Sequence, residues 1–196
     1  MATSIIGRAG NSRVRKQTED GFSLLEVVIS MAVLTVGLVS LLGVFGLAMA
    51  STQTSQQDMI AKQLANEALE SIVTARNTSQ VSWAQVQNAA SGGIFMDGAN
   101  PIYLAGADGI VGTADDAVAG EQTLIEPGPD GVFGTADDVQ IPLTGYQRTI
   151  LISPVLDSSG NVVATLRGVN ITLQYTTSQA RLPKTYVLSS FISQYR

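Results

Sequence analysis

The residues best suited to chemistry in this sequence are carboxylates in a short segment that occurs twice. Asp108-Gly-Ile-Val-Gly-Thr-Ala-Asp-Asp116 recurs 22 residues later as Asp130-Gly-Val-Phe-Gly-Thr-Ala-Asp-Asp138, with seven of nine positions identical. Each copy combines oxygen ligands with glycines that let the backbone turn sharply, as a calcium loop requires. The candidate calcium ligands are Asp108, Asp115, Asp116, Asp130, Asp137 and Asp138.

The repeated segment supports a second interpretation as well. It does not match the EF-hand pattern, because it has neither an Asp at every second position nor a closing Glu. The two copies are then Asp-Gly turns whose carboxylates accept hydrogen bonds from backbone amides. If calcium does bind, its role is structural, because six carboxylates without a cation repel one another and loosen residues 105 to 140.

Composition excludes most other site chemistry. The sequence contains no cysteine and no histidine, so the usual zinc, haem and non-haem iron ligand sets cannot be assembled. Ser-His and Cys-His nucleophiles are excluded for the same reason. The adjacent Asp pairs 115/116 and 137/138 are the nearest candidates for a hydrolase, but adjacent side chains on a strand or turn point apart. We therefore expect no enzymatic activity.

The charge distribution separates a basic start from an acidic body. The net charge is −5, and the first 21 residues hold four basic and two acidic side chains. The remaining 7 basic and 14 acidic side chains give the body a charge of −7. A phosphate backbone would repel such a surface, so no nucleic-acid partner is expected.

A long apolar segment follows the basic start. Val27 to Ala50 is a run of 24 residues without a charge, which as a helix is long enough to cross a bilayer core of ~30 Å. The positive-inside rule then places the N-terminus in the cytoplasm and everything after residue 50 outside it. The alternative is a secretory signal peptide cut after Ala48-Met49-Ala50, but such signals have apolar regions of only about 7 to 15 residues.

Helical periodicity continues beyond the apolar segment. Ile60, Leu64, Ala68 and Ile72 recur at intervals of four residues, and polar residues occupy the other face. Residues 22 to 76 therefore form one helix of ~80 Å at 1.5 Å per residue, too long for a compact domain of this size. Its amphipathic half is expected to cover a sheet.

The last third of the chain shows strand patterns. Runs at 148–153, 162–177 and 185–193 are rich in β-branched and aromatic residues, and a turn cluster at 157–161 separates the first two. These runs predict an antiparallel meander of three or four strands. The fold class is α+β: a long N-terminal α-helix packed on a small antiparallel β-sheet.

The start of the apolar helix carries a recognisable motif. Gly21-Phe22-Ser-Leu-Leu-Glu26-Val-Val directly follows the charged stretch from Lys16 to Asp20. This arrangement resembles the class III signal of type IV prepilin-like proteins, which include type IV pilins and type II secretion pseudopilins. The resemblance implies a pilin-like fold, cleavage by prepilin peptidase after Gly21 and methylation of the new N-terminus at Phe22.

Glu26 would be the fifth residue of the processed chain. The resemblance implies that its carboxylate pairs with the free N-terminal amine of a neighbouring subunit during assembly. An ionisable residue in an apolar helix is costly unless it has such a partner. In the alternative interpretation Glu26 lies at the membrane surface in water, where only the positive end of the helix favours its charge.

Finer features resemble two subclasses. The run Ala61-Lys-Gln-Leu-Ala-Asn-Glu-Ala-Leu-Glu-Ser-Ile72 and the terminal strand Tyr186–Ile192 are similar to PilV-type minor pilins and GspI-type minor pseudopilins. One departure is the absence of the proline that many major pilins have within the apolar helix. Gly37, Gly43 and Gly46 take its place as residues that loosen a helix or allow close packing.

These observations predict five segments: a cleaved basic leader (1–21), a transmembrane assembly segment (22–50), an amphipathic exported helix (51–80), a Gly/Asp-rich loop region (81–145) and an antiparallel sheet (146–196). The expected function is that of a minor pilin or pseudopilin that primes a filament or lies at its tip. The alternatives are a major filament subunit and a membrane-anchored, calcium-binding adhesin or uptake factor.

The resemblance also implies partners and a location. The partners are prepilin peptidase, other pilins or pseudopilins and the inner-membrane assembly machinery. The chain would be held by a single pass in the bacterial inner membrane with its head in the periplasm, and after assembly it would be part of a periplasmic or extracellular filament.

Overall fold

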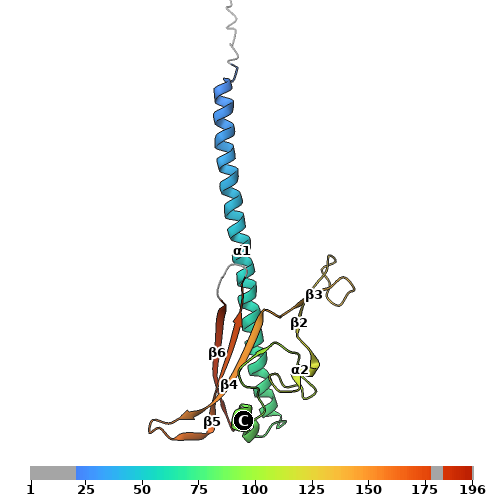
Figure 1. Cartoon of the computed structure of the whole chain (residues 1–196), viewed down its shortest axis with the longest axis vertical. Coiled ribbons are helices and arrows are strands. Elements are labelled where there is room, and N and C mark those ends of the chain that lie inside the picture. The colour runs from blue at the N-terminus through green and yellow to red at the C-terminus, as the bar shows by residue number, and fades with distance from the viewer. Residues whose placement is uncertain (1–20, 178–182, 196) are drawn as a thin grey trace, which may run out of the picture. The chain divides into compact units, whose positions relative to one another are not determined.

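A computed structural model describes residues 21–177 and 183–195 (Figure 1). The expected basic leader lies outside the described residues except for Gly21. The chain divides into two compact units, Met1–Gly46 and Leu47–Arg196. We describe each unit by itself and call the second one the head.

The first unit contains the start of helix α1 (Leu24–Asn77). Its apolar side chains are exposed, and α1 is long and apolar enough, by length and composition, to cross a membrane. Thr35 and Ser40, two of the three hydroxyl residues in its apolar run, donate hydrogen bonds to carbonyls one turn earlier, Thr35 Oγ1 to Met31 O at 2.7 Å and Ser40 Oγ to Val36 O at 2.8 Å. These bonds satisfy the two hydroxyls within the helix, as a bilayer requires.

In the head, α1 ends at Asn77. Ser79 adopts a left-handed conformation with φ 60°, and the Gln80 N–H donates to Ala75 O at 3.0 Å. A left-handed residue just past the last turn commonly ends a helix, because it redirects the chain while satisfying free carbonyls.

Four antiparallel strands form the main sheet in the order β1-β4-β5-β6 (Figure 1). The three long strands match the three predicted runs closely. The bounds are Ala99–Pro101 for β1, Tyr146–Leu156 for β4, Val162–Tyr175 for β5 and Lys184–Ser193 for β6.

The core of the head lies between α1 and this sheet. The buried helix residues recur every three or four positions and are mostly alanines, which allow helix and sheet to approach closely. They are Ala61, Leu64, Ala65, Ala68, Ile72 and Ala75, and they pack with Ile150, Val169, Ile171 and Leu173 of the strands. The predicted α+β fold, a long helix on an antiparallel sheet, is confirmed.

Polar contacts connect α1 to the end of β5, to β6 and to the chain just after β6. Lys184 Nζ lies 3.0 Å from Asp58 Oδ1, and the Tyr175 hydroxyl donates to the same oxygen at 2.7 Å. Further along, Arg76 Nη1 donates to Tyr195 O at 2.8 Å. The hydrogen bond from Tyr175, followed by Lys184, lowers the pKa of Asp58, while burial and then Asp58 raise the pKa of Tyr175 to about 12.

One cation is buried under the sheet. Arg148 is buried, its Nη1 lies 3.8 Å from Glu67 Oε2, and burial lowers its pKa. Glu67 and then Asp116 act in the opposite direction by Coulombic attraction. A buried guanidinium requires such carboxylates nearby, because an unpaired buried charge is strongly unfavourable.

A short strand and one side chain, neither of which was predicted from the sequence, cover the edge of β4. Strand β1 pairs with residues 147–149, and beyond it the Asn88 side chain donates to Ile150 O and accepts from Ile152 N–H, both at 2.7 Å. The amide of Asn88 thus continues the hydrogen bonding of a strand. Covering an edge in this way blocks unwanted strand pairing.

Residues 81–145 contain more regular structure than a loop region. Besides β1 they form the 3₁₀ turns η1 (Trp83–Gln85) and η2 (Ala89–Ser91), the short helix α2 (Asp116–Ala119) and a two-stranded hairpin of β2 (Thr123–Glu126) and β3 (Val139–Pro142). These elements have three or four residues each, too few for a periodic pattern to reveal. Trp83 of η1 donates from Nε1 to Ala164 O at 2.8 Å and stacks under the Arg167 guanidinium.

Candidate functional site

The proposed cleavage site lies in a segment that is accessible to a peptidase. Gly21, Phe22 and Ser23 precede α1 and are exposed and non-helical. The helix begins directly after them, with the Val27 N–H donating to Ser23 O at 3.2 Å. The bond between Gly21 and Phe22, the predicted cleavage site, therefore lies in exposed, non-helical backbone next to the helix start.

Glu26 is isolated from other charges in the described part of the chain. It lies in the first turn of α1 and is exposed, and no other charged residue occurs between residues 21 and 57. None of the ion pairs among the described residues includes Glu26. The positive end of the helix favours its carboxylate only modestly, so any strong partner must come from elsewhere.

The two repeated segments fold alike. We call residues 106–116 loop 1 and residues 128–138 loop 2. Seven hydrogen bonds occur at equivalent positions in both loops. In loop 1 they run from Gly109 N to Gly106 O, Asp116 N to Thr113 O, Asp108 N to Asp115 Oδ2, Ile110 N to Asp108 Oδ1, Gly112 N to Asp116 Oδ2, and from Thr113 Oγ1 to both Ile110 O and Asp115 Oδ1. In loop 2 they link the residues 22 positions later.

The structure extends the repeat by two residues upstream. A Cβ on Gly106 would lie 2.3 Å from Asp115 Oδ2, and one on Gly128 would lie 2.2 Å from Asp137 Oδ2. Only glycine fits these positions, because real Cβ atoms do not approach other atoms so closely. Sequence reasoning began the repeat at Asp108 and missed both glycines, although extending the alignment of the two copies would have found them.

Loop 1 brings its three carboxylates together. Ligand oxygens of Asp108, Asp115 and Asp116 lie within 4.8 Å of one another. Among the described residues, the equivalent carboxylates of loop 2 do not form such a group. Hydrogen bonds from the Thr113 and Thr135 hydroxyls lower the pKa of Asp115 and Asp137 respectively, so both are ionised at neutral pH.

The carboxylates of loop 1 also accept hydrogen bonds from backbone N–H groups of the same loop. The Asp116 side chain is 1% exposed and accepts from Gly106 N–H at 2.9 Å and Gly112 N–H at 2.6 Å. Each carboxylate oxygen has a second lone pair that a cation could use. The geometry is therefore compatible both with turns closed by carboxylates and with a cation site.

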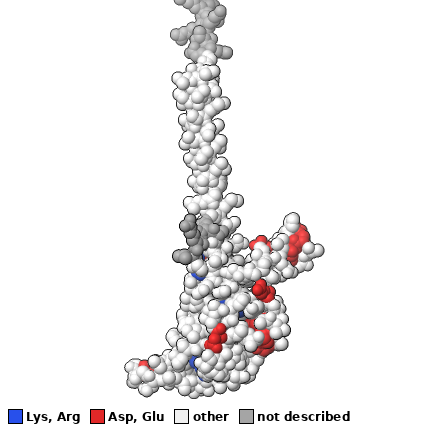
Figure 2. All heavy atoms as spheres, viewed as in Figure 1, with Lys and Arg blue, Asp and Glu red and all other residues white. Residues whose placement is uncertain are grey.

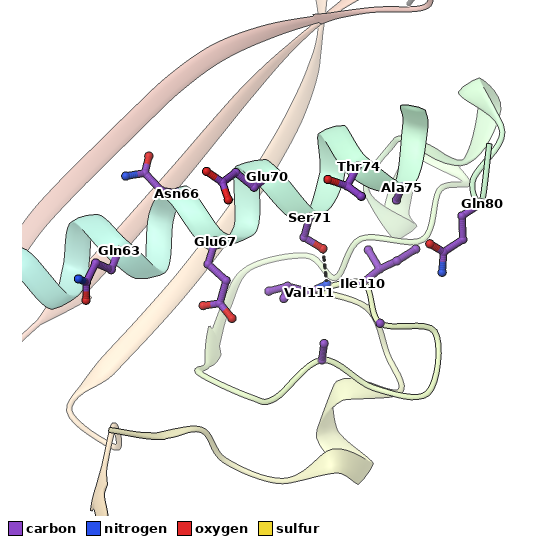
Figure 3. A pocket seen from close by; sticks show the side chains of 12 residues that line it. Gln63, Asn66, Glu67, Glu70, Ser71, Thr74, Ala75, Gln80, Ile110 and Val111 are labelled. Carbon is purple, nitrogen blue, oxygen red and sulfur yellow. Dashed lines mark hydrogen bonds between the residues drawn. The ribbon is translucent and has the colours of Figure 1, made fainter. Parts of the chain in front are cut away.

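Loop 1 is docked on α1. The Val111 N–H donates to Ser71 Oγ at 2.9 Å, and Ile110 is buried beside it. Figure 3 shows Glu67 and Ser71 on the helix side of a groove of about 560 Å³, with loop 1 opposite them. Polar residues of α1 line one side of this groove and Ile110 and Val111 of loop 1 line the other, so the groove marks the boundary where loop 1 meets the helix.

The candidate residues thus occupy two separate units. Gly21, Phe22 and Glu26 belong to the first unit, and the six Asp residues belong to the head. The N-terminal residues lie at the start of an exposed apolar helix, whereas the Asp residues lie in two loops of the head.

Comparison with known proteins assigns the N-terminal segment. The family model described as the prokaryotic N-terminal methylation motif matches residues 16–42. This span includes Gly21, Phe22, Glu26 and the first part of α1. No curated protein and no solved structure matches the chain.

The matched motif and the fold agree with each other. A long apolar helix starts at the motif, and an α+β head with an antiparallel sheet follows it. Proteins of the pilin type that carry this motif are structural subunits, and the apolar helix fits a membrane anchor. At residues 16–42 the chain carries the N-terminal methylation motif (class III signal) of type IV prepilin-like proteins, which indicates a pilin-like or pseudopilin protein.

Proposed function

We propose that this protein is a minor pilin or minor pseudopilin, a non-enzymatic subunit that is incorporated into a type IV pilus or a type II secretion pseudopilus. The observation that carries the proposal is the methylation motif at the start of an uninterrupted, exposed apolar helix. Such a helix requires a bilayer or the core of a filament to cover it. The PilV-like and GspI-like features at 61–72 and 186–192 support the minor class.

The proposed function implies an order of processing and assembly steps. Prepilin peptidase cuts after Gly21 and methylates Phe22 on the cytoplasmic side of the inner membrane. The head lies in the periplasm, and the assembly machinery then moves the subunit into a filament, where it primes assembly or occupies the tip. Glu26 pairs with the N-terminal amine of the neighbouring subunit, since no ion pair among the described residues includes it.

The first experiment is mass spectrometry of the N-terminus of the full chain, extracted from membranes with and without a co-expressed prepilin peptidase. We expect N-methyl-Phe22 as the first residue only when the peptidase is present. Sheared filaments should contain the same N-terminal peptide. A chain that begins at Ser51, or one that keeps its leader in both samples, would exclude the assembly role.

Two alternatives predict different outcomes. A major subunit would account for most of the protein in the sheared fraction, whereas a minor subunit is present at a small fraction of the most abundant pilin. An adhesin or uptake factor would retain a specific extracellular ligand in a pull-down with the assembled filament. Quantitative mass spectrometry of the filament separates the first alternative from our proposal.

We also propose calcium as a structural ligand of the repeated loops. The favouring observation is the cluster of carboxylate oxygens from Asp108, Asp115 and Asp116 in loop 1. Three carboxylates this close together repel one another, and a divalent cation with oxygen ligands removes the repulsion. The equivalent residues of loop 2, Asp130, Asp137 and Asp138, would need a small rearrangement to bind in the same way.

Hydrogen exchange tests the calcium proposal. At calcium 100 times above its dissociation constant, binding stabilises the closed loop by about 2.7 kcal/mol, which slows amide exchange by roughly 100-fold. We expect this protection in residues 105–140 of the full chain and none in α1. Magnesium at the same concentration is the control. Equal exchange in calcium and in a chelator would favour turns that close without an ion.

A further inference from the structure

The two loops share sequence and hydrogen bonding but differ in what covers them. In loop 1, Ile110 and Val111 are 2% and 3% exposed, because the loop is seated on α1 and β4. Their equivalents in loop 2, Val132 and Phe133, are 54% and 66% exposed. Loop 2 is carried at the end of the β2–β3 hairpin (Figure 1). The head therefore contains the same docking element twice. Loop 1 packs against the rest of the head, whereas the apolar side chains of loop 2 are exposed.

Loop 1 shows what the element requires of its seat. The Val111 N–H takes a hydroxyl acceptor from a helix, Ser71 Oγ. Asp116 lies in the field of Arg148, a buried cation. The seat thus consists of a helix with a hydroxyl side chain, an apolar surface for two side chains and a positive charge.

Among the described residues, no ion pair includes a carboxylate of loop 2. Residues 121–147 contain five carboxylates and no Lys or Arg, and Figure 2 shows acidic atoms gathered at the end of the hairpin. Asp138 Oδ1 is shielded from solvent and has no hydrogen-bond partner, whereas Asp116 Oδ1 accepts from Gly106 N–H. A shielded carboxylate oxygen without a donor is unfavourable, so a cationic partner would stabilise loop 2.

We propose that loop 2 docks on a helix of a neighbouring filament subunit of different sequence, one that presents a hydroxyl residue and a Lys or Arg. Val132 and Phe133 are buried in this contact, and the basic side chain approaches Asp138. This inference rests on the proposed function as a filament subunit. The chemistry of the partner follows from the negative charge of loop 2 and from the contacts that loop 1 makes with its own helix and with Arg148.

Among the described residues of a second copy, the seat that loop 1 uses is already taken. Ser71 accepts from loop 1 of its own chain, and Arg148 is buried with Glu67. Of the two described lysines, Lys184 is paired with Asp58, whereas Lys62 is exposed on α1 but lies outside this seat. We therefore place loop 2 on a subunit of another sequence, as expected for a minor component whose neighbours are other pilins.

Site-specific photo-crosslinking in cells tests the contact. The photoreactive residue p-benzoylphenylalanine replaces Phe133 in the full chain, and the control places it at Val118, which is 90% exposed but belongs to α2. We expect an adduct from position 133 with a helix peptide that contains Lys or Arg, in a different chain that carries its own methylation motif. No adduct above the control, or an adduct with a second copy, would overturn the proposal.

A matched pair of variants adds a quantitative readout. Phe133→Ser should reduce the amount of the chain in sheared filaments by about tenfold or more, because central aromatic anchors dominate interfaces, while Val118→Ser should leave it unchanged. Unchanged incorporation of Phe133→Ser would overturn the proposal. The crosslink should form equally with a chelator present, and a requirement for calcium would contradict a basic side chain as the source of charge.

Failure of this inference is distinguishable from failure of the proposed function. If N-methyl-Phe22 is found in filaments while loop 2 makes no adduct, only the docking contact is wrong. If the wild-type chain is absent from filaments, the proposed function is wrong, and the docking contact is overturned with it.

Discussion

Glu26→Gln is expected to leave cleavage and methylation intact while reducing incorporation into filaments by at least about 100-fold. Glutamine keeps the size of the side chain but removes the charge, so the N-terminal amine of the neighbouring subunit is left buried without a partner. Breaking a buried ion pair in this way costs about 3–5 kcal/mol, which corresponds to two orders of magnitude or more in an equilibrium constant.

The size of this effect depends on the isolation of Glu26. No other charged residue lies between residues 21 and 57, so no neighbouring carboxylate on the helix can replace it. Quantitative mass spectrometry of the N-methyl-Phe22 peptide, in the membrane fraction and in the sheared fraction, measures processing and incorporation separately.

Glu70→Gln is the matched control, because Glu70 is an exposed carboxylate of the same helix in the head. It should be processed and incorporated as the wild type is. If Glu26→Gln reaches the filament fraction at the wild-type level, the carboxylate has no role in assembly, and the alternative of a solvated residue at the membrane surface is correct.

The long elements could be predicted from the sequence because their patterns are local and repeated many times. The helical positions of Leu64, Ala68 and Ile72 and the alternation of Ile171, Leu173 and Tyr175 each mark one buried face. Pairing one apolar helix stripe with one apolar sheet face leaves little choice of architecture. Fold class therefore followed from periodicity, as did the part of the core that α1 and the long strands supply, whereas core residues of the segment 81–145 such as Phe95 and Ile110 did not.

The short elements could not be predicted, because tertiary contacts form them. Strand β1 has three residues and ends in Pro101, which local patterns place in a loop, yet it pairs with β4 at the sheet edge where proline is tolerated. Asn88 covers the next part of that edge from 62 residues away along the chain. A pattern within a window of residues contains no information on such contacts.

The two loops show the same limit at the candidate site. Their sequences predict equal carboxylate clusters, and seven of their internal hydrogen bonds are indeed equivalent. Asp116 is buried in loop 1, which packs on α1 and β4, while its equivalent Asp138 remains half-buried. The burial of each carboxylate depends on where its loop lies in the fold. Because the repeated sequence is the same in both loops, it cannot predict this difference.

This difference gives the second large prediction. Asp116→Ala is expected to lower the free energy of unfolding of the head by about 3 kcal/mol, since it removes two hydrogen bonds to a charged acceptor. It leaves the buried N–H of Gly112 and the half-buried N–H of Gly106 without partners. It also removes a carboxylate near the buried Arg148. Asp138→Ala makes the same chemical change in loop 2, where solvent can reach Gly134 N–H, and should cost less than about 1 kcal/mol.

Urea unfolding of the full chain in detergent, followed by the fluorescence of the single tryptophan, compares the two variants. Trp83 reports on the head because it bonds to Ala164 and stacks on Arg167. Both measurements are made with a chelator present, so that calcium does not contribute. Equal destabilisation by Asp116→Ala and Asp138→Ala would mean that the carboxylates act only within their own loops. A large difference would show that loop 1 is a structural part of the head and that loop 2, built in the same way, is free to act elsewhere.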